Sequence, residues 1–160
     1  MHLNTAGLYY EDFSVGCGFV SAARVIAPAD VETFSRLTRD ANPIHTDAAH
    51  MSTHPLGRPV VHGMLVAALG VGLIAELGLT RGTLVAMLAQ HIEYKSPVYV
   101  GDTVHVKMEV IDKRDTRHPS RGIVTYRYEI MNDANVIAVV GTNTNMVFRK
   151  NALNQNGDEK

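Results

Sequence analysis

The sequence predicts an α+β fold in which a long, buried helix lies in a curved antiparallel β-sheet. The segment from His62 to Gly78 is apolar nearly all the way round, and such a helix needs cover on most of its sides. Four long strand-like segments follow and are joined by short turns, which favours antiparallel pairing. A sheet that wraps around the helix satisfies both observations.

The first elements precede this helix. The segment from Gly18 to Ile26 is apolar and small enough to predict a strand. Pro28 suits the first turn of a helix, because its missing N–H would have no partner there. This helix is expected to run to about Arg39 and to deliver Asp40 at its exit.

The long strands come after the helix. Two segments alternate apolar and polar residues with a period of two, as strands with one dry face do. Gly101-Asp102 and the run from Asn132 to Asn135 supply turn residues between strands. The four strands are expected at about 83–95, 104–110, 124–130 and 136–148.

Length and composition bound the class of protein. With 160 residues, 46% of them hydrophobic, the chain suits one domain over 1–150 with a flexible tail at 151–160. A net charge of −1 and the lack of a basic run argue against nucleic acid and anionic membrane partners. Glycines, His62 and Glu76 argue against a membrane span. The single Cys17 and the absence of a secretory signal predict a cytoplasmic protein.

The stretch DANPIH places Asp40 and His45 five residues apart, with an Asn-Pro break between them. On an unbroken helix the two side chains would be separated by about 500° of rotation and would not meet. Pro43 is expected to end the helix, and a bent loop could then bring the carboxylate and the imidazole to one water or substrate proton. An ordinary turn is the alternative, because Asp, Asn and Pro are common turn formers.

Gly63 stands at the start of the buried helix, where the first N–H groups have no intrahelical partner and the helix dipole is positive. An oxygen that gains charge in a transition state could bind there, since glycine has no side chain to block its approach. The alternative is that Gly63 simply packs close to a strand.

Four motifs give the chain a family resemblance over about Tyr9 to Phe148. They are YYEDFSVG, LTRDANPIHTDAAH, RPVVHGML and KSPVYVGDTV. In this order the sequence resembles the MaoC-like, R-specific enoyl-CoA hydratase family, which has the hot dog fold. The second motif is the most specific, because the family signature contains an acid, any residue, Asn-Pro, an aliphatic residue and His. Arg39 is a departure, since the family usually has Gly there, and it is a candidate to touch substrate.

The resemblance implies an activity and a site. Asp40 and His45 would be the catalytic pair, Asn42 would support their loop, and Gly63 would supply the oxyanion N–H. The reaction would hydrate a trans-2-enoyl thioester to the R-3-hydroxyacyl thioester, or reverse this. The sequence does not decide which of the pair is the base. Coenzyme A or an acyl-carrier protein would carry the acyl group, with no metal or other cofactor, and the chain would form a homodimer or higher homo-oligomer.

The buried helix also predicts an acyl pocket. If the acyl chain runs along the helix, the face that follows Gly63 passes Val71 and Ile74, whose branched side chains would close the pocket. This interpretation predicts short acyl chains of about four to six carbons, because each excess methylene forfeits about 0.8 kcal/mol of burial. Alternatively, both residues are ordinary core.

Three other functions compete with hydration. Four histidines lie close together in the sequence and suggest a metal site, although Pro55 limits any helix there. A hot dog thioesterase would bind the same substrates with a lone carboxylate. A non-catalytic subunit would bind an acyl thioester without chemistry of its own. The candidate metal ligands are His45, His50, His54 and His62.

Overall fold

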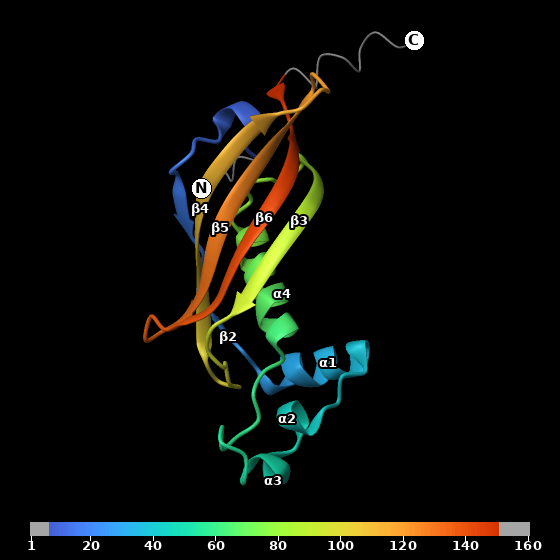
Figure 1. The fold of residues 1–160 in the computed structure, drawn as a ribbon, viewed down its shortest axis with the longest axis vertical. Helices are drawn as coiled ribbons and strands as arrows, with labels where there is room; N and C mark the ends of the chain where they lie inside the picture. The colour runs from blue at the N-terminus through green and yellow to red at the C-terminus, as the bar shows by residue number, and fades with distance from the viewer. Residues whose placement is uncertain (1–6, 151–160) are drawn as a thin grey trace, which may run out of the picture.

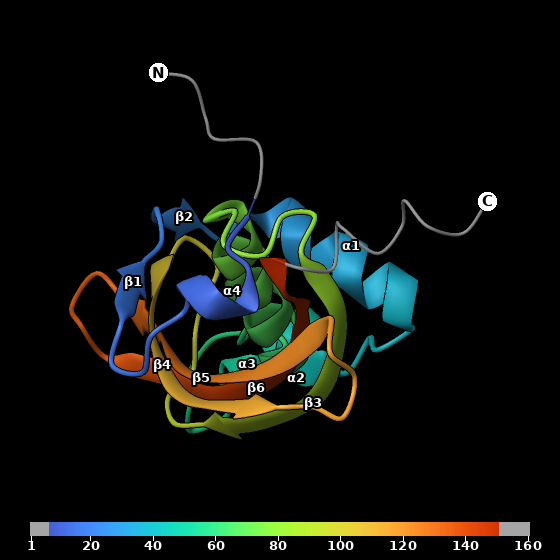
Figure 2. The ribbon, with the colours of Figure 1, turned by 90° about the horizontal axis from the view of Figure 1, so that it is seen from above.

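The computed structural model describes residues 7–150 of the chain. A sheet of antiparallel strands curves around one long helix, α4 (Gly63–Glu76), as Figures 1 and 2 show from two directions. Three shorter helices lie beyond the N-terminal end of α4 (Figure 1). They are α1 (Pro28–Thr38), α2 (Pro43–Thr46) and α3 (Ala48–Met51). The predicted helix in a curved antiparallel sheet is confirmed.

The sheet has six strands in the order β1-β4-β5-β6-β3, with β2 also paired to β4. All the pairings are antiparallel, and β3 lies at one edge of the sheet. The four long strands match the segments that the alternation predicts, although β4 and β5 run farther along their hairpin. The strands are β1 (Gly18–Val20), β2 (Arg24–Val25), β3 (Leu84–Tyr94), β4 (Thr103–Asp115), β5 (Arg121–Asn132) and β6 (Ile137–Phe148).

The main core lies between α4 and the inner face of the sheet. Leu65, Val66 and Leu73 of the helix are buried there with Val106 and Tyr128 of the strands. Burying each of these large side chains stabilises the fold by about 1.5–3 kcal/mol. The core therefore fixes the axis of α4, and with it the position of its N-terminus.

Gly70 lets the helix approach the sheet closely. A Cβ atom at this position would lie 2.3 Å from Cδ1 of Ile130, which is a severe overlap. Because Ile130 is fully buried, its side chain has little room to move away. A glycine is therefore needed where α4 crosses β5.

The first predicted strand, Gly18 to Ile26, is divided into β1 and β2. Ser21 lies at the break, and its N–H donates to the carbonyl of Val106 at 2.9 Å. Its Oγ accepts from the N–H of Val106 at 2.9 Å, in the place of a backbone carbonyl. The side chain thus competes with the strand ladder, as serine hydroxyls can, and the chain leaves the sheet until Arg24.

Helix α1 ends at Thr38, one residue before the predicted end. Arg39 has a φ of 63° and a left-handed conformation, which terminates the helix. The helix ends close to Asp40 as predicted, but Arg39 and not Pro43 ends it, because Pro43 is the first residue of α2. Proline is well suited to the first position of a helix, and Asn42 caps the new helix.

Within residues 7–150 no helix is long and apolar enough to cross a membrane. The tail predicted at 151–160 lies outside the described residues.

Candidate active site

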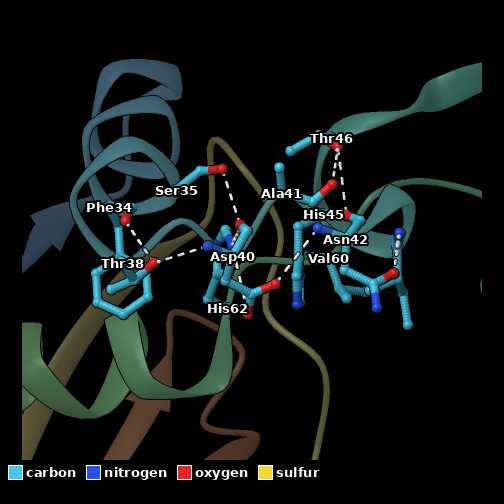
Figure 3. A network of polar contacts seen from close by, with 11 residues as sticks. Phe34, Ser35, Thr38, Asp40, Ala41, Asn42, His45, Thr46, Val60 and His62 are labelled. Carbon is cyan, nitrogen blue, oxygen red and sulfur yellow. Dashed lines mark hydrogen bonds and ion pairs between the residues drawn. The ribbon is translucent and has the colours of Figure 1, made fainter.

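Asp40, His45 and His62 come together at the N-terminal end of α4. Each offers a ligand atom, and these atoms all lie within 4.8 Å of one another. The three residues come from different elements, since Asp40 follows α1, His45 lies in α2 and His62 immediately precedes α4 (Figure 3). The structure thus brings together the acid and the imidazole of DANPIH, as the bent-loop hypothesis requires.

The backbone of Asp40 is held by hydrogen bonds on both sides. Its carbonyl oxygen accepts from Oγ of Ser35 at 2.8 Å and from Nε2 of His62 at 2.9 Å (Figure 3). Its N–H donates to Oγ1 of Thr38 at 3.3 Å. The carboxylate is 51% exposed, and its Oδ1 accepts the N–H of Asn42 at 3.3 Å. A fixed backbone therefore presents a carboxylate that solvent or a ligand can reach.

The ring of His45 is oriented by a backbone carbonyl. Its Nδ1 lies 2.8 Å from the carbonyl oxygen of Val60. A carbonyl oxygen can only accept, so Nδ1 carries the hydrogen and donates it. In the neutral ring Nε2 then holds the lone pair and can take a proton.

His62 is buried beneath the pair, with 2% of its surface exposed. Its ring stacks on that of His45, with 3.8 Å between centroids and 26° between planes. The ring of Phe34 lies against it as well, at 5.1 Å and 55°. Among residues 7–150, Nδ1 of His62 has no hydrogen-bond partner.

A hollow of about 430 Å³ opens over these groups. Gly63 forms part of its wall at the first position of α4, where the backbone N–H has no intrahelical partner. The preceding residue, His62, makes no side-chain cap hydrogen bond to the helix. The hollow therefore contains a carboxylate, an imidazole and a helix N-terminus. Its lining residues are Phe34, Thr38, Asp40, His45, His62, Gly63, Met64 and Tyr94.

The ring of Tyr94 lies directly against Gly63. A Cβ atom at position 63 would be 2.8 Å from Cε1 of this ring, so a larger residue there would push the half-exposed ring aside. The Tyr94 hydroxyl donates to Sδ of Met64 at 3.1 Å, and burial raises the pKa of the phenol. Gly63 and Tyr94 also line a second hollow of about 270 Å³, so the tyrosine ring forms a wall between the two.

The group able to reach one metal ion in the described chain is Asp40, His45 and His62, and it does not include His50 or His54. The imidazoles of His45 and His62 are stacked. One nitrogen of each ring is bonded to a backbone carbonyl, which leaves Nε2 of His45 and Nδ1 of His62 as the other ring nitrogens. The three groups could hold either a water for proton transfer or a metal ion.

Comparison with known proteins decides the family. Residues 17–130 match the sequence profile described as "MaoC like domain". The chain belongs to the MaoC-like family. An (R)-specific enoyl-CoA hydratase of Aeromonas caviae is 36% identical over 113 residues, which are 71% of this chain and 80% of that one. A 3-hydroxybutyryl-CoA dehydratase of Methylorubrum extorquens is 34% identical over 116 residues, 71% of each chain.

Solved structures share the architecture. The structure of the A. caviae (R)-hydratase superposes with a TM-score of 0.71 at 32% identity, covering 84% of this chain and 96% of that one. A conserved hypothetical protein of Mycobacterium tuberculosis, described as having a double hot dog fold, gives a TM-score of 0.81 at 17% identity. That match covers 99% of this chain and 47% of the other. The fold of this MaoC-like chain is therefore the hot dog fold.

The structure separates the remaining predicted site residues of this MaoC-like domain from the hollow. Asn42 supports the turn, because its Oδ1 accepts the N–H of Ile44 at 3.2 Å. Arg39 is exposed and does not line the hollow. Val71 is half-buried on α4, and Ile74 lines a separate cavity of about 20 Å³ near the other end of the helix.

Sequence reasoning named His62 only as a candidate metal ligand, and it missed four other residues that line the hollow, namely Phe34, Thr38, Met64 and Tyr94. His62 carried a signal, since it is a polar residue at the start of an otherwise apolar helix. Tyr94 directly precedes the KSPV motif, but its contact with Gly63 joins residues far apart in the sequence. Only the packing of β3 beside α4 reveals it.

Proposed function

We propose that the protein catalyses the R-specific hydration of trans-2-enoyl-CoA to R-3-hydroxyacyl-CoA, and the reverse dehydration. The observation that carries this proposal is the meeting of Asp40 and His45 at the N-terminus of α4. The names of the A. caviae and M. extorquens relatives support the same reaction and the same carrier.

The reaction needs a water activated next to C3 and a proton delivered to C2. In the proposed mechanism the Asp40 carboxylate and Nε2 of His45 hold one water between them. One of the two groups removes a proton as the water oxygen bonds to C3, and the pair returns a proton to C2 on the same face. His45 suits the role of base, because its Nδ1 is occupied by the Val60 carbonyl and its Nε2 is left as an acceptor.

The electrons of the double bond move onto the thioester oxygen while the C3–O bond forms. The proposed partner of this oxygen is the N–H of Gly63, aided by the positive end of the α4 dipole. When C2 is protonated the electrons return and the thioester carbonyl is restored. Addition of one water is thereby balanced, with no oxidant or reductant.

The first prediction tests the pair. Asp40→Asn and His45→Gln should each lower kcat for crotonyl-CoA hydration by about 10² to 10⁴, because proton transfer by a positioned group contributes that much. The loss of absorbance of the conjugated double bond measures the rate. Unchanged circular dichroism serves as the control for folding.

Release of free thiol, followed in the same samples, separates hydration from thioester hydrolysis. Thiol release without hydration would identify a thioesterase instead. Wild-type turnover in both variants would refute the assigned pair, and binding of crotonyl-CoA without either reaction would indicate a non-catalytic subunit. Activity that survives a strong chelator would remove the metal alternative.

A further inference from the structure

We infer that His62 is a positioning residue of the same site, which holds the Asp40 backbone and the His45 ring in one relative geometry. This inference rests on the proposed function for its kinetic consequence. Its structural basis is independent, because His62 contacts both members of the pair and is itself almost completely buried.

The contact with Asp40 is a hydrogen bond to the backbone. Nε2 of His62 lies 2.9 Å from the Asp40 carbonyl oxygen, which cannot donate, so Nε2 must carry the hydrogen. The carboxylate Oδ2 of Asp40 is 4.0 Å from the same nitrogen, which is too far for a hydrogen bond. His62 therefore fixes the backbone from which the Asp40 side chain extends, and it makes no hydrogen bond to the carboxylate itself.

The contact with His45 is a ring stack. With 3.8 Å between centroids, the face of His62 forms the floor on which the His45 ring lies. Phe34 packs against His62 and, together with the Asp40 hydrogen bond, leaves the ring little freedom to turn. The Val60 hydrogen bond orients His45 within its plane, while the stack sets the plane.

The remaining nitrogen of His62 adds no further hydrogen bond. Nδ1 is buried and has no partner among the described residues. The Asp40 carbonyl and the rings of His45 and Phe34 are therefore the contacts that hold this side chain.

The position of His62 in the chain extends this role to the oxyanion site. It is the residue before Gly63, so its backbone sets the entry of the chain into α4. A single residue therefore joins the acid, the imidazole and the first N–H of the helix. A misplacement of about 1 Å among such groups can cost about 10²-fold in rate.

Three substitutions separate the contacts. His62→Phe keeps a ring for stacking but removes the donor, His62→Gln keeps an N–H donor but removes the ring, and His62→Ala removes both. Val31→Ala is the matched control, because Val31 is a buried core residue of α1 outside the hollow. Each variant is compared with wild type by thermal melting and by crotonyl-CoA hydration.

The expected result is a fall in kcat of about 10²-fold for His62→Ala with little change in KM, and partial recovery in His62→Gln and His62→Phe. A residue that only supports the fold would lower the melting temperature and leave kcat per folded molecule as in Val31→Ala. That outcome would overturn the inference, as would a rise in KM with an unchanged kcat.

A second readout does not depend on activity. In protein labelled with ¹⁵N-histidine, the ring signals of His45, assigned by their loss in His45→Gln, should report one tautomer in wild type and in Val31→Ala. In His62→Ala the plane of the His45 ring is no longer set, so the hydrogen bond from Nδ1 to the Val60 carbonyl should form only part of the time and a mixture of tautomers should appear. If wild type lacks hydratase activity, the proposed function fails, yet this mixture would still support the positioning role. An unchanged His45 signal in His62→Ala would then refute it.

Discussion

Arg39 is one of two non-glycine residues with a positive φ in the described chain, and the other, Asn135, is of a type that tolerates this conformation better. The φ of 63° places Arg39 in the left-handed region, which costs a non-glycine residue about 1–2 kcal/mol. Arg39 terminates α1 and turns the chain into the segment that holds Asp40. The strain therefore lies directly beside the candidate catalytic carboxylate.

Replacing this residue tests both strain and substrate contact. Arg39→Gly should raise the free energy of unfolding by about 1 kcal/mol, since glycine adopts the left-handed conformation without penalty. Arg39→Ala should give no such gain. Chemical denaturation measures the difference, and an equal effect of both variants would contradict the backbone explanation. A rise in KM common to both would instead show that the guanidinium touches substrate.

At this scale the sequence revealed the pair but not its surroundings. The proximity of Asp40 and His45 was predictable because an Asn-Pro pair between them does not fit one unbroken helix, although Arg39 and not Pro43 ends α1. The stacking of His62 on His45 and the contact of Tyr94 with Gly63 were not, because each depends on how distant elements pack. The hydrogen bond between His45 and Val60 was not predictable either, because it uses a backbone carbonyl, which every residue has.

Helix α4 is the element that links the site to the core. Its N-terminus faces the hollow, while its later residues pack on the sheet or line the small cavity that contains Ile74. Its existence and approximate limits follow from its unbroken apolar sequence. The division of the first strand into β1 and β2 could not be predicted from the sequence. The Ser21 hydroxyl takes the place of a backbone carbonyl only when β4 lies beside it.

The predicted preference for short acyl chains is a property of this helix. Ile74→Ala should enlarge the small cavity, and it should shift the chain-length optimum upward if the acyl chain extends from the hollow along α4 to that cavity. Val71→Ala should do the same if the chain passes that face of the helix. A hydration series from four to about twelve carbons measures the optimum, since each buried methylene contributes about 0.8 kcal/mol.

Leu73→Ala is the control for this series. Leu73 is a buried neighbour on the same helix that does not line the small cavity. Its truncation should lower the free energy of unfolding by about 2–5 kcal/mol, as the truncation of Ile74 should. It should leave the chain-length optimum in place. A wild-type preference for long chains, or an optimum that neither Val71→Ala nor Ile74→Ala moves, would refute the pocket hypothesis.

At the scale of the whole molecule the sheet has one long open edge. Within residues 7–150, strand β3 pairs only with β6, and it exposes Leu84, Met87 and Leu88 by 43–47% of their surface. An exposed apolar edge strand of this length is a template for pairing with another chain. We therefore propose a homodimer in which β3 pairs with its copy across a twofold axis and extends the sheet.

Sedimentation velocity tests this assembly. Wild type should sediment as a dimer or a larger oligomer, and Leu88→Glu should weaken association by placing like charges close together across the twofold axis. Val20→Glu, on β1 at the opposite edge, is the matched control, because Val20 is also well exposed. A fully active wild-type monomer would contradict the proposal.

The two hydrogen bonds that orient His45 and His62 both end on peptide carbonyls, those of Val60 and Asp40. A peptide carbonyl is present whatever side chain its residue carries. A replacement at position 60 that keeps the backbone path therefore leaves the hydrogen on Nδ1 of His45. Relatives can then diverge at that position while their imidazoles inherit the same arrangement of donors and acceptors.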